Sequence, residues 1–194
     1  MIGVIRAAAD LQDFCRAAGW RFCFIGGLAV QRWAEPRLTR DVDVILLTGF
    51  GPEDDHIRTL LARYSPRIAD AMDFARANRV LLLEAPGGIG LDISLGAIPF
   101  EESAVTRSRP EKMAPGIRLQ VCSPEDLIVL KAFAGRPIDW HDVKMTIARQ
   151  GAGKLDWSYI EGQLAPLCEV KGEPETVDRL KELRAEVDGR GGKR

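Results

Sequence analysis

Two aspartates open a segment of otherwise apolar, strand-like residues. Residues 41–47 read DVDVILL, so Asp41 and Asp43 are spaced i, i+2. On a strand this spacing places both carboxylates on one face, while Val42 and Val44 point to the other. Two such charges ~4–6 Å apart repel by a few kcal/mol at an effective dielectric constant of ~20. A divalent cation would offset that repulsion, since Mg²⁺ takes one or two protein carboxylates and leaves its other positions to water and phosphates.

The same pair also has a purely structural explanation. Asp41 could be a solvated residue at the start of the strand, and Asp43 could form an ion pair with Arg37 or Arg40. The Asp-x-Asp motif alone does not decide between the two explanations, because short motifs recur by chance.

A third acid lies inside a second apolar segment. Asp92 is surrounded by aliphatic residues in IGLDISLG (89–96), and an unpaired buried carboxylate is energetically costly. If this strand lies beside 41–47, three carboxylates converge as the ligand set of a two-metal phosphoryl-transfer site. The alternative is an edge strand with a polar outer face, for which Asp92 and Ser94 alternate correctly.

A glycine pair precedes these acids. Gly26 and Gly27 separate the strand-like residues 21–25 from a helix-like segment at 28–34. Without Cβ atoms, their N–H groups could approach a phosphate at the beginning of a helix. An ordinary strand-to-helix turn would explain the same two residues.

The remaining pattern indicates which elements must position these groups. Helical periodicity predicts helices at 4–18, 53–63, 123–135, 138–149, 156–166 and 174–187. Strands are predicted at 21–25, 41–47, 79–85, 89–97 and 117–122, with 79–97 forming a hairpin. The proline-rich, charged stretch 98–116 is expected to be a loop. The pattern therefore predicts a mixed α/β core at 1–122, a helical region at 123–188 and a disordered tail at 189–194.

Composition excludes several classes of protein. The 194 residues are 46% hydrophobic and 28% charged, with a formal net charge of −1, so any polyanion-binding site must be local rather than a general basic surface. The four cysteines show no CxxC or zinc spacing and indicate reduced thiols in a cytoplasmic protein. Charged residues interrupt the first fourteen positions, so we expect neither a signal peptide nor a membrane span.

The ordered set of strand, Gly-Gly, helix, Asp-x-Asp strand and Asp-bearing strand resembles the DNA-polymerase-β-like nucleotidyltransferase superfamily. A closer similarity is to the AbiEii/AbiGii-like (MenT-like) nucleotidyltransferases of bacterial toxin–antitoxin and phage-defence systems. It covers roughly residues 20–150 and lies in the segments IGGLAV, RLTRDVD, SPEDLIVLK and GRPIDWHDV. The resemblance implies an α+β nucleotidyltransferase fold: a small mixed β-sheet flanked by helices, followed by a C-terminal helical bundle.

The resemblance also implies roles for particular residues. Asp41, Asp43 and Asp92 correspond to the catalytic and metal-binding acids, and Gly26, Gly27, Arg40 and Lys131 to the residues that bind the nucleotide. A secondary set comprises Arg37, Thr39, Arg136, Asp139 and Asp142. Simpler explanations stay open: Lys131 could be a solvent-facing lysine, Asp139 or Asp142 a helix-start charge, and the basic residues near Asp41 mere counter-charges.

The function implied is the transfer of an NMP from a nucleoside triphosphate to a hydroxyl acceptor with two Mg²⁺ ions, or Mn²⁺ in their place. By family analogy the acceptor is the 3′ end of a tRNA, and the enzyme is a toxin with a cognate antitoxin protein; no membrane partner is expected. Two alternatives are a small-molecule or protein adenylyltransferase and a non-catalytic nucleotidyltransferase-like antitoxin or binding module.

Overall fold

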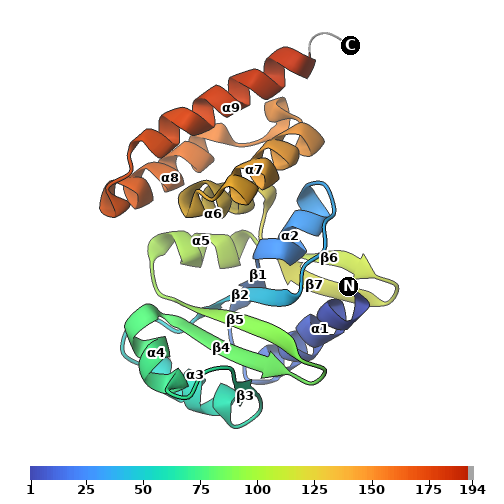
Figure 1. Cartoon of the computed structure of the whole chain (residues 1–194), viewed down its shortest axis with the longest axis vertical. Helices are drawn as coiled ribbons and strands as arrows, with labels where there is room; N and C mark the ends of the chain where they lie inside the picture. Colours follow the sequence, from blue (N-terminus) through green and yellow to red (C-terminus); the bar gives the residue numbers. More distant parts are fainter. Residues whose placement is uncertain (192–194) are drawn as a thin grey trace. The chain divides into compact units, whose positions relative to one another are not determined.

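The structure is a computed structural model that describes residues 1–191, with side chains up to residue 189 (Figure 1). The chain forms two compact units: Met1–Leu28 with Leu38–Cys122, and Ala29–Arg37 with the chain from Ser123 onward. The boundary after Cys122 is the point where alternating strands and helices give way to helices alone. The short segment 29–37 belongs with the second unit, although it lies early in the sequence.

A seven-stranded mixed sheet forms the centre of the first unit, in the order β3-β4-β5-β2-β1-β7-β6. The strands are β1 (Phe22–Phe24), β2 (Asp41–Leu47), β3 (Ser65–Pro66), β4 (Val80–Ala85), β5 (Ile89–Gly96), β6 (Arg109–Ala114) and β7 (Ile117–Val121). The pairs β2–β5 and β1–β7 are parallel and the others antiparallel. The predicted β4–β5 hairpin and the predicted strand at 41–47 are confirmed.

Five helices begin in the first unit. They are α1 (Ile2–Ala17), α2 (Gly26–Trp33), α3 (Glu53–Leu61), α4 (Ala71–Asn78) and α5 (Pro99–Arg107), of which α2 continues into the second unit. Helix α1 packs against β7, β2 and β5, and α4 against β4. An added Cβ on Gly3 of α1 would lie 3.3 Å from Ile89 Cδ1, so the face of β5 that carries Ile89 faces α1. Asp92, three positions further along the strand, points to the other face.

The stretch 98–116 is not a loop, contrary to the prediction. Helix α5 begins at Pro99, where a missing N–H costs nothing. The Glu101 carboxylate accepts hydrogen bonds from the N–H groups of Ala97 (2.8 Å) and Ile98 (3.1 Å). Phe100 and Ala104 are buried and hold the helix to the sheet.

The same stretch also contributes strand β6, which pairs with β7 at the edge of the sheet. An edge strand tolerates Pro110, because one side of it needs no ladder hydrogen bond. Pro115 lies in the turn that joins the two strands. The three prolines therefore do not mark a loop: Pro99 begins a helix, Pro110 lies on an edge strand and Pro115 lies in a turn.

The second unit consists of helices α6 (Pro124–Ala134), α7 (Pro137–Gln150), α8 (Trp157–Lys171) and α9 (Glu175–Gly191), with a 3₁₀ turn at Ala152–Lys154. Ser123 caps α6 by accepting the Asp126 N–H at 3.2 Å, and Gly135 ends it with φ +71°. Helix α8 runs five residues past the predicted end at 166, and Pro166 lies inside it. Leu164 and Cys168, on either side of this proline, are buried, and this burial favours continuation of the helix through Pro166.

The predicted α+β architecture, a mixed sheet with flanking helices and a helical C-terminal region, is confirmed. Helix α9 includes residues 189–191 of the expected tail, and 192–194 lie outside the described residues. The four cysteines all lie among the described residues, where they are buried and form no disulfide, and burial raises the pKa of Cys15 to about 12. None of the described helices is long and apolar enough to cross a lipid bilayer.

Arg79 joins two parts of the sheet unit and provides a test of this fold. It ends α4 with a left-handed φ of 55°. Its guanidinium donates hydrogen bonds to the carbonyls of Leu95 (2.6 Å) and Gly49 (2.8 Å) and forms an ion pair with Glu53 at 3.2 Å.

We expect Arg79→Ala to lower the free energy of unfolding by about 3 kcal/mol, since several charge-assisted hydrogen bonds are lost. Arg79→Gly should recover about 1 kcal/mol of this loss, because glycine adopts positive φ without strain. Urea denaturation measures both. Arg58→Ala, which removes an exposed arginine of α3, is the control and should have a much smaller effect.

Candidate active site

The register between β2 and β5 brings the predicted acids together. Asp43 lies directly opposite Asp92, and Asp41 lies opposite Gly90. Paired residues of neighbouring strands point to the same face, so Asp41, Asp43 and Asp92 share the face of the sheet that lies opposite α1. All three side chains are partly exposed, so the group is open to solvent and to a ligand.

The electrostatics of Asp92 reflect this crowding. Partial burial raises its pKa, and the negative charges of Asp43 and Asp41 raise it further. The cation of Arg67 acts in the opposite direction but does not cancel the rise. The neutral form of Asp92 is therefore favoured more than that of an isolated, solvated aspartate.

Arg67 is a member of the site that sequence reasoning missed. It follows β3 and forms a direct ion pair with the Asp92 carboxylate. The two residues are 25 positions apart, and Arg67 lies outside every helix and strand that the sequence predicts. Nothing local in the sequence indicates this partner.

Glycines allow the close packing around the acids. A Cβ on Gly26 would lie 2.5 Å from Asp43 Cγ, and one on Gly27 would lie 2.6 Å from Thr39 Cβ. A Cβ on Gly90 would likewise collide with the Asp41 carboxylate. Positions 26 and 90 therefore have to be glycine if the carboxylates of Asp43 and Asp41 are to keep their places, and position 27 has to be glycine if Thr39 is to keep its place.

The glycine pair itself differs from the predicted turn before a helix. Helix α2 begins at Gly26, which has a left-handed φ of 54°. The Gly27 N–H donates a hydrogen bond to Asp43 Oδ2 at 3.3 Å. In this structure the Gly27 amide therefore orients a carboxylate, and phosphate binding by the pair stays a prediction.

The residues just before β2 have different environments. The Thr39 hydroxyl donates a hydrogen bond to the Asp41 carbonyl at 3.2 Å. Arg40 is exposed and makes no hydrogen bond or ion pair with the part of the chain that the structure describes. It is therefore unengaged and available to an anionic ligand.

The other predicted residues form a buried ion-pair network inside the second unit. Lys131 Nζ lies 2.8 Å from Asp139 Oδ1 and 2.9 Å from Asp142 Oδ2. Arg37 binds Asp142 through two hydrogen bonds of 3.0 and 2.9 Å, and Arg136 binds Asp139 at 2.5 Å. Lys131 is buried rather than solvent-facing. Contact of Lys131 with nucleotide phosphates stays a prediction.

The pKa values of the two aspartates show that the network favours their charged forms. Burial alone would raise the pKa of Asp139, but hydrogen bonds from Arg136 and Lys131 outweigh it and hold the pKa below its usual range. The pKa of Asp142 is lowered in the same way by Arg37 and Lys131, against the effect of burial.

A metal ion would need oxygen ligands that converge. As the side chains lie, no group of three or more His, Cys, Asp or Glu side chains within residues 1–191 could hold a metal ion. The donor chemistry nevertheless fits a hard cation, because three carboxylates share one face of the sheet. The Asp92 carboxylate already binds a cation, the guanidinium of Arg67.

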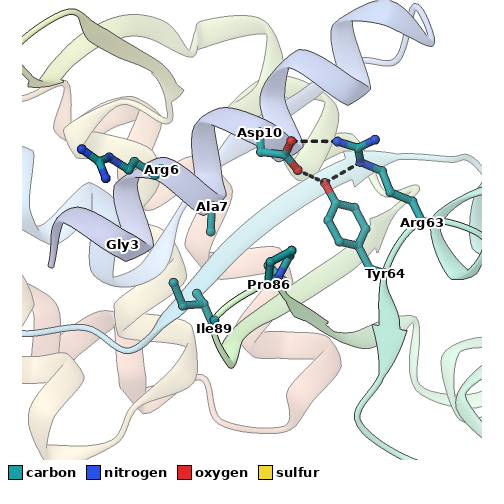
Figure 2. A pocket seen from close by; sticks show the side chains of 10 residues that line it. Gly3, Arg6, Ala7, Asp10, Arg63, Tyr64, Pro86 and Ile89 are labelled. Carbon is teal, nitrogen blue, oxygen red and sulfur yellow. Dashed lines mark hydrogen bonds and ion pairs between the residues drawn. The ribbon is translucent and has the colours of Figure 1, made fainter.

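A separate cavity of about 630 Å³ lies on the α1 side of the sheet (Figure 2). Its polar wall is a hydrogen-bonded trio in which Asp10 accepts from Arg63 (2.7 Å) and from the Tyr64 hydroxyl (2.8 Å). Burial raises the pKa of Tyr64 to about 12. The cavity includes Ile89, whose side chain points away from the face of Asp92, so it is not part of the carboxylate site.

A comparison of two glycine substitutions tests the packing at the site. Gly26 and Gly19 both have positive φ, but nothing lies within 4 Å of a Cβ placed on Gly19. We expect Gly19→Ala to cost about 1 kcal/mol from backbone strain alone. Gly26→Ala should cost about 2 kcal/mol more, because its Cβ collides with Asp43. Equal losses in urea denaturation would contradict this account of Gly26.

The buried network predicts a loss of stability in acid. Because the folded-state pKa values of Asp139 and Asp142 are lowered, their contribution is complete above the ordinary value of 3.8 and is lost as the pH falls below it. Lys131→Met should lower the free energy of unfolding by about 3 kcal/mol at pH 7, since it leaves two buried carboxylates with fewer cations. Lys144→Met is the control, because Lys144 is a half-exposed lysine of α7 that pairs with Glu186 outside the buried network. An equal effect of both substitutions on urea denaturation would rule out a special role for Lys131.

Comparison with known proteins agrees with this arrangement. Among solved structures, an antigenic nucleotidyltransferase-like protein from Paracoccidioides brasiliensis matches with a TM-score of 0.54 and 16% identity, over 92% of each chain. The antibiotic-resistance factor ANT(2″)-Ia matches with a TM-score of 0.50 and 20% identity, over 90% of this chain and 92% of that one. A search of curated proteins finds no match.

These structural neighbours share the nucleotidyltransferase fold, as the sequence predicted. The family model of the nucleotidyl transferase AbiEii toxin of type IV toxin–antitoxin systems matches residues 11–188. This match covers the sheet unit with its three acids as well as the helical unit with its ion-pair network. The chain therefore belongs to the AbiEii nucleotidyltransferase toxin family and is a nucleotidyltransferase.

Proposed function

We propose that the chain transfers an NMP from a nucleoside triphosphate to a hydroxyl acceptor at the carboxylates Asp41, Asp43 and Asp92. The observation that carries this proposal is the direct pairing of Asp43 with Asp92 across two parallel strands, with Asp41 on the same face. A structural role alone does not account for three like charges placed together, since their repulsion costs free energy. Three carboxylates on one solvent-accessible face suit a site that binds divalent cations.

We assign Asp41, Asp43 and Asp92 as the residues that would hold Mg²⁺, as two ions, or Mn²⁺ in their place. When bound, the metal would supply positive charge that neutralises the triphosphate and polarises its α-phosphate. Nucleotidyltransferases generally use divalent metals, and the oxygen donor set is of the type that Mg²⁺ prefers.

The remaining chemistry falls to the protein's own groups. The acceptor oxygen attacks the α-phosphorus, the bond to the bridging oxygen breaks, and pyrophosphate leaves. Asp92 accepts the proton of the hydroxyl. The Gly26–Gly27 start of α2 keeps Asp43 in place, and the unengaged guanidinium of Arg40 supplies positive charge for the triphosphate.

For the acceptor we favour the 3′ end of a tRNA. The support is the family, whose members are toxins of type IV toxin–antitoxin systems; modification of a molecule required for translation would explain toxicity. The same context suggests a cognate antitoxin protein as a partner. Small-molecule and protein acceptors use the same site chemistry, so the experiment has to include them.

The experiment incubates the purified chain with each of four α-³²P-labelled nucleoside triphosphates and Mg²⁺. Separate reactions contain total tRNA, a protein lysate or an aminoglycoside. We expect label to appear on tRNA, to depend on Mg²⁺, and to fall by about 10³-fold in Asp43→Asn. The asparagine keeps the shape of the side chain and can still accept the Gly27 N–H, so thermal unfolding should change little.

Asp13→Asn, at an exposed position of α1, is the matched control and should transfer label normally. Normal transfer by Asp43→Asn or Asp41→Asn would refute the assignment of the site. Label on protein or on the aminoglycoside but not on tRNA would identify a different acceptor for the same nucleotidyl-transfer reaction.

A further inference from the structure

Arg67 contacts the carboxylate site directly. Its guanidinium forms an ion pair with the Asp92 carboxylate, and the two side chains are 29% and 36% exposed. A Cβ placed on Gly90 would lie 3.0 Å from Arg67 Nη1 and would also collide with the Asp41 carboxylate. The guanidinium therefore lies close to two of the three acids.

The backbone of the sheet holds Arg67 in line with those acids. The Arg67 N–H donates a hydrogen bond to the Leu82 carbonyl at 3.0 Å, just beyond the short strand β3. Leu82 lies opposite Asp92, and Asp92 lies opposite Asp43. Arg67, directly after β3, thus lies in one row with Leu82 of β4, Asp92 of β5 and Asp43 of β2. The ion pair results from the register of the sheet, not from a chance contact of two long surface chains.

Charge explains why a cation is placed there. The Asp92 carboxylate lies beside those of Asp43 and Asp41 on one face of the sheet, and the Arg67 guanidinium brings a positive charge into direct contact with it. The guanidinium and a divalent cation compete for the Asp92 carboxylate, whose Oδ1 is occupied by Arg67. Binding of a metal through Oδ1 requires this contact to break, and binding through Oδ2 places two cations on one carboxylate, where they repel each other.

We propose that Arg67 is the counter-cation of the metal-free site: it pairs with Asp92 until a divalent cation displaces it, and so it sets the affinity for that cation. This inference rests on the proposed function, since it assumes that the three carboxylates bind the metal. Arg67 acts here through Asp92 as a positioning residue and touches no reacting atom.

A purely structural role for Arg67 makes the opposite prediction. If the ion pair served only to hold β3 and to shape the acids, its removal would leave the affinity for metal unchanged or weaker. If Arg67 competes with the metal, removal of the guanidinium has to tighten metal binding, because no cation then has to be displaced and one nearby positive charge is gone. The sign of the change separates the two roles.

The experiment titrates Mg²⁺ alone into the full chain and measures its Kd by isothermal calorimetry, with no nucleotide and no activity assay. We expect Arg67→Gln to bind Mg²⁺ about 5- to 10-fold more tightly than the unsubstituted chain, the range expected for loss of a partly exposed ion pair and a nearby positive charge. Arg67→Lys, which keeps the charge but has a shorter reach and no planar fork, should give a smaller tightening of about 2-fold.

Arg21→Gln is the matched control, since it removes another arginine–carboxylate ion pair of the same unit, the one with Glu102. Its Kd for Mg²⁺ should equal that of the unsubstituted chain. In thermal unfolding, the metal-free Arg67→Gln chain should melt lower, and saturating Mg²⁺ should raise its melting temperature by more than it raises that of the unsubstituted chain.

An unchanged or weaker affinity in Arg67→Gln would overturn the counter-cation role while leaving the proposed function standing. If Arg67→Gln does not fold, Arg67→Lys decides, and a Kd no lower than that of the unsubstituted chain overturns the proposal. No Mg²⁺ binding by any of these chains would overturn both the proposed metal site and this role of Arg67.

Discussion

Repulsion between carboxylates that the sheet holds together is the constraint on which the site depends. Strands β2 and β5 are parallel neighbours in a register that places Asp43 against Asp92, and the core residues on their opposite face fix that register. A slip by one residue would bury the acids and expose the core. The surroundings of the acids follow from this: glycines without Cβ atoms at 26, 27 and 90, the Gly27 amide on Asp43, and Arg67 on Asp92.

The sequence predicted the acids because their signal is local, but it could not predict their counter-charge. Aspartate has a low propensity for strands, yet two aspartates at i, i+2 lie in one apolar strand and a third lies in another. This conflict is visible in the sequence without a structure. Arg67 is one of many arginines, and its importance comes from the pairing of β3 with β4 and of β4 with β5. Such non-local pairings leave no trace in the composition of a single segment.

The fold shows the same division between local and non-local information. Helix α6 was predicted from Ser123 to Gly135 because the cap, the first-turn proline and the terminal glycine all lie within it. Residues 98–116 were misjudged because their prolines have different meanings in a helix start, an edge strand and a turn. Only the pairing of β6 with β7 distinguishes an edge strand there from a loop.

The motif RLTRDVD is divided between the two units, which changes what its residues imply. Arg37 binds Asp142 in the helical unit, whereas Thr39 packs beside Gly27 and hydrogen-bonds the Asp41 carbonyl in the sheet unit. Two motif residues that are two positions apart therefore anchor the chain on either side of the crossing between units. The spacing of this motif thus combines two requirements, the placement of the acids on β2 and the attachment of segment 29–37 to the buried network of Lys131. A match to the motif alone would assign both Arg37 and Thr39 to catalysis. In the structure, Arg37 contacts Asp142 of the helical unit, and this contact anchors the chain.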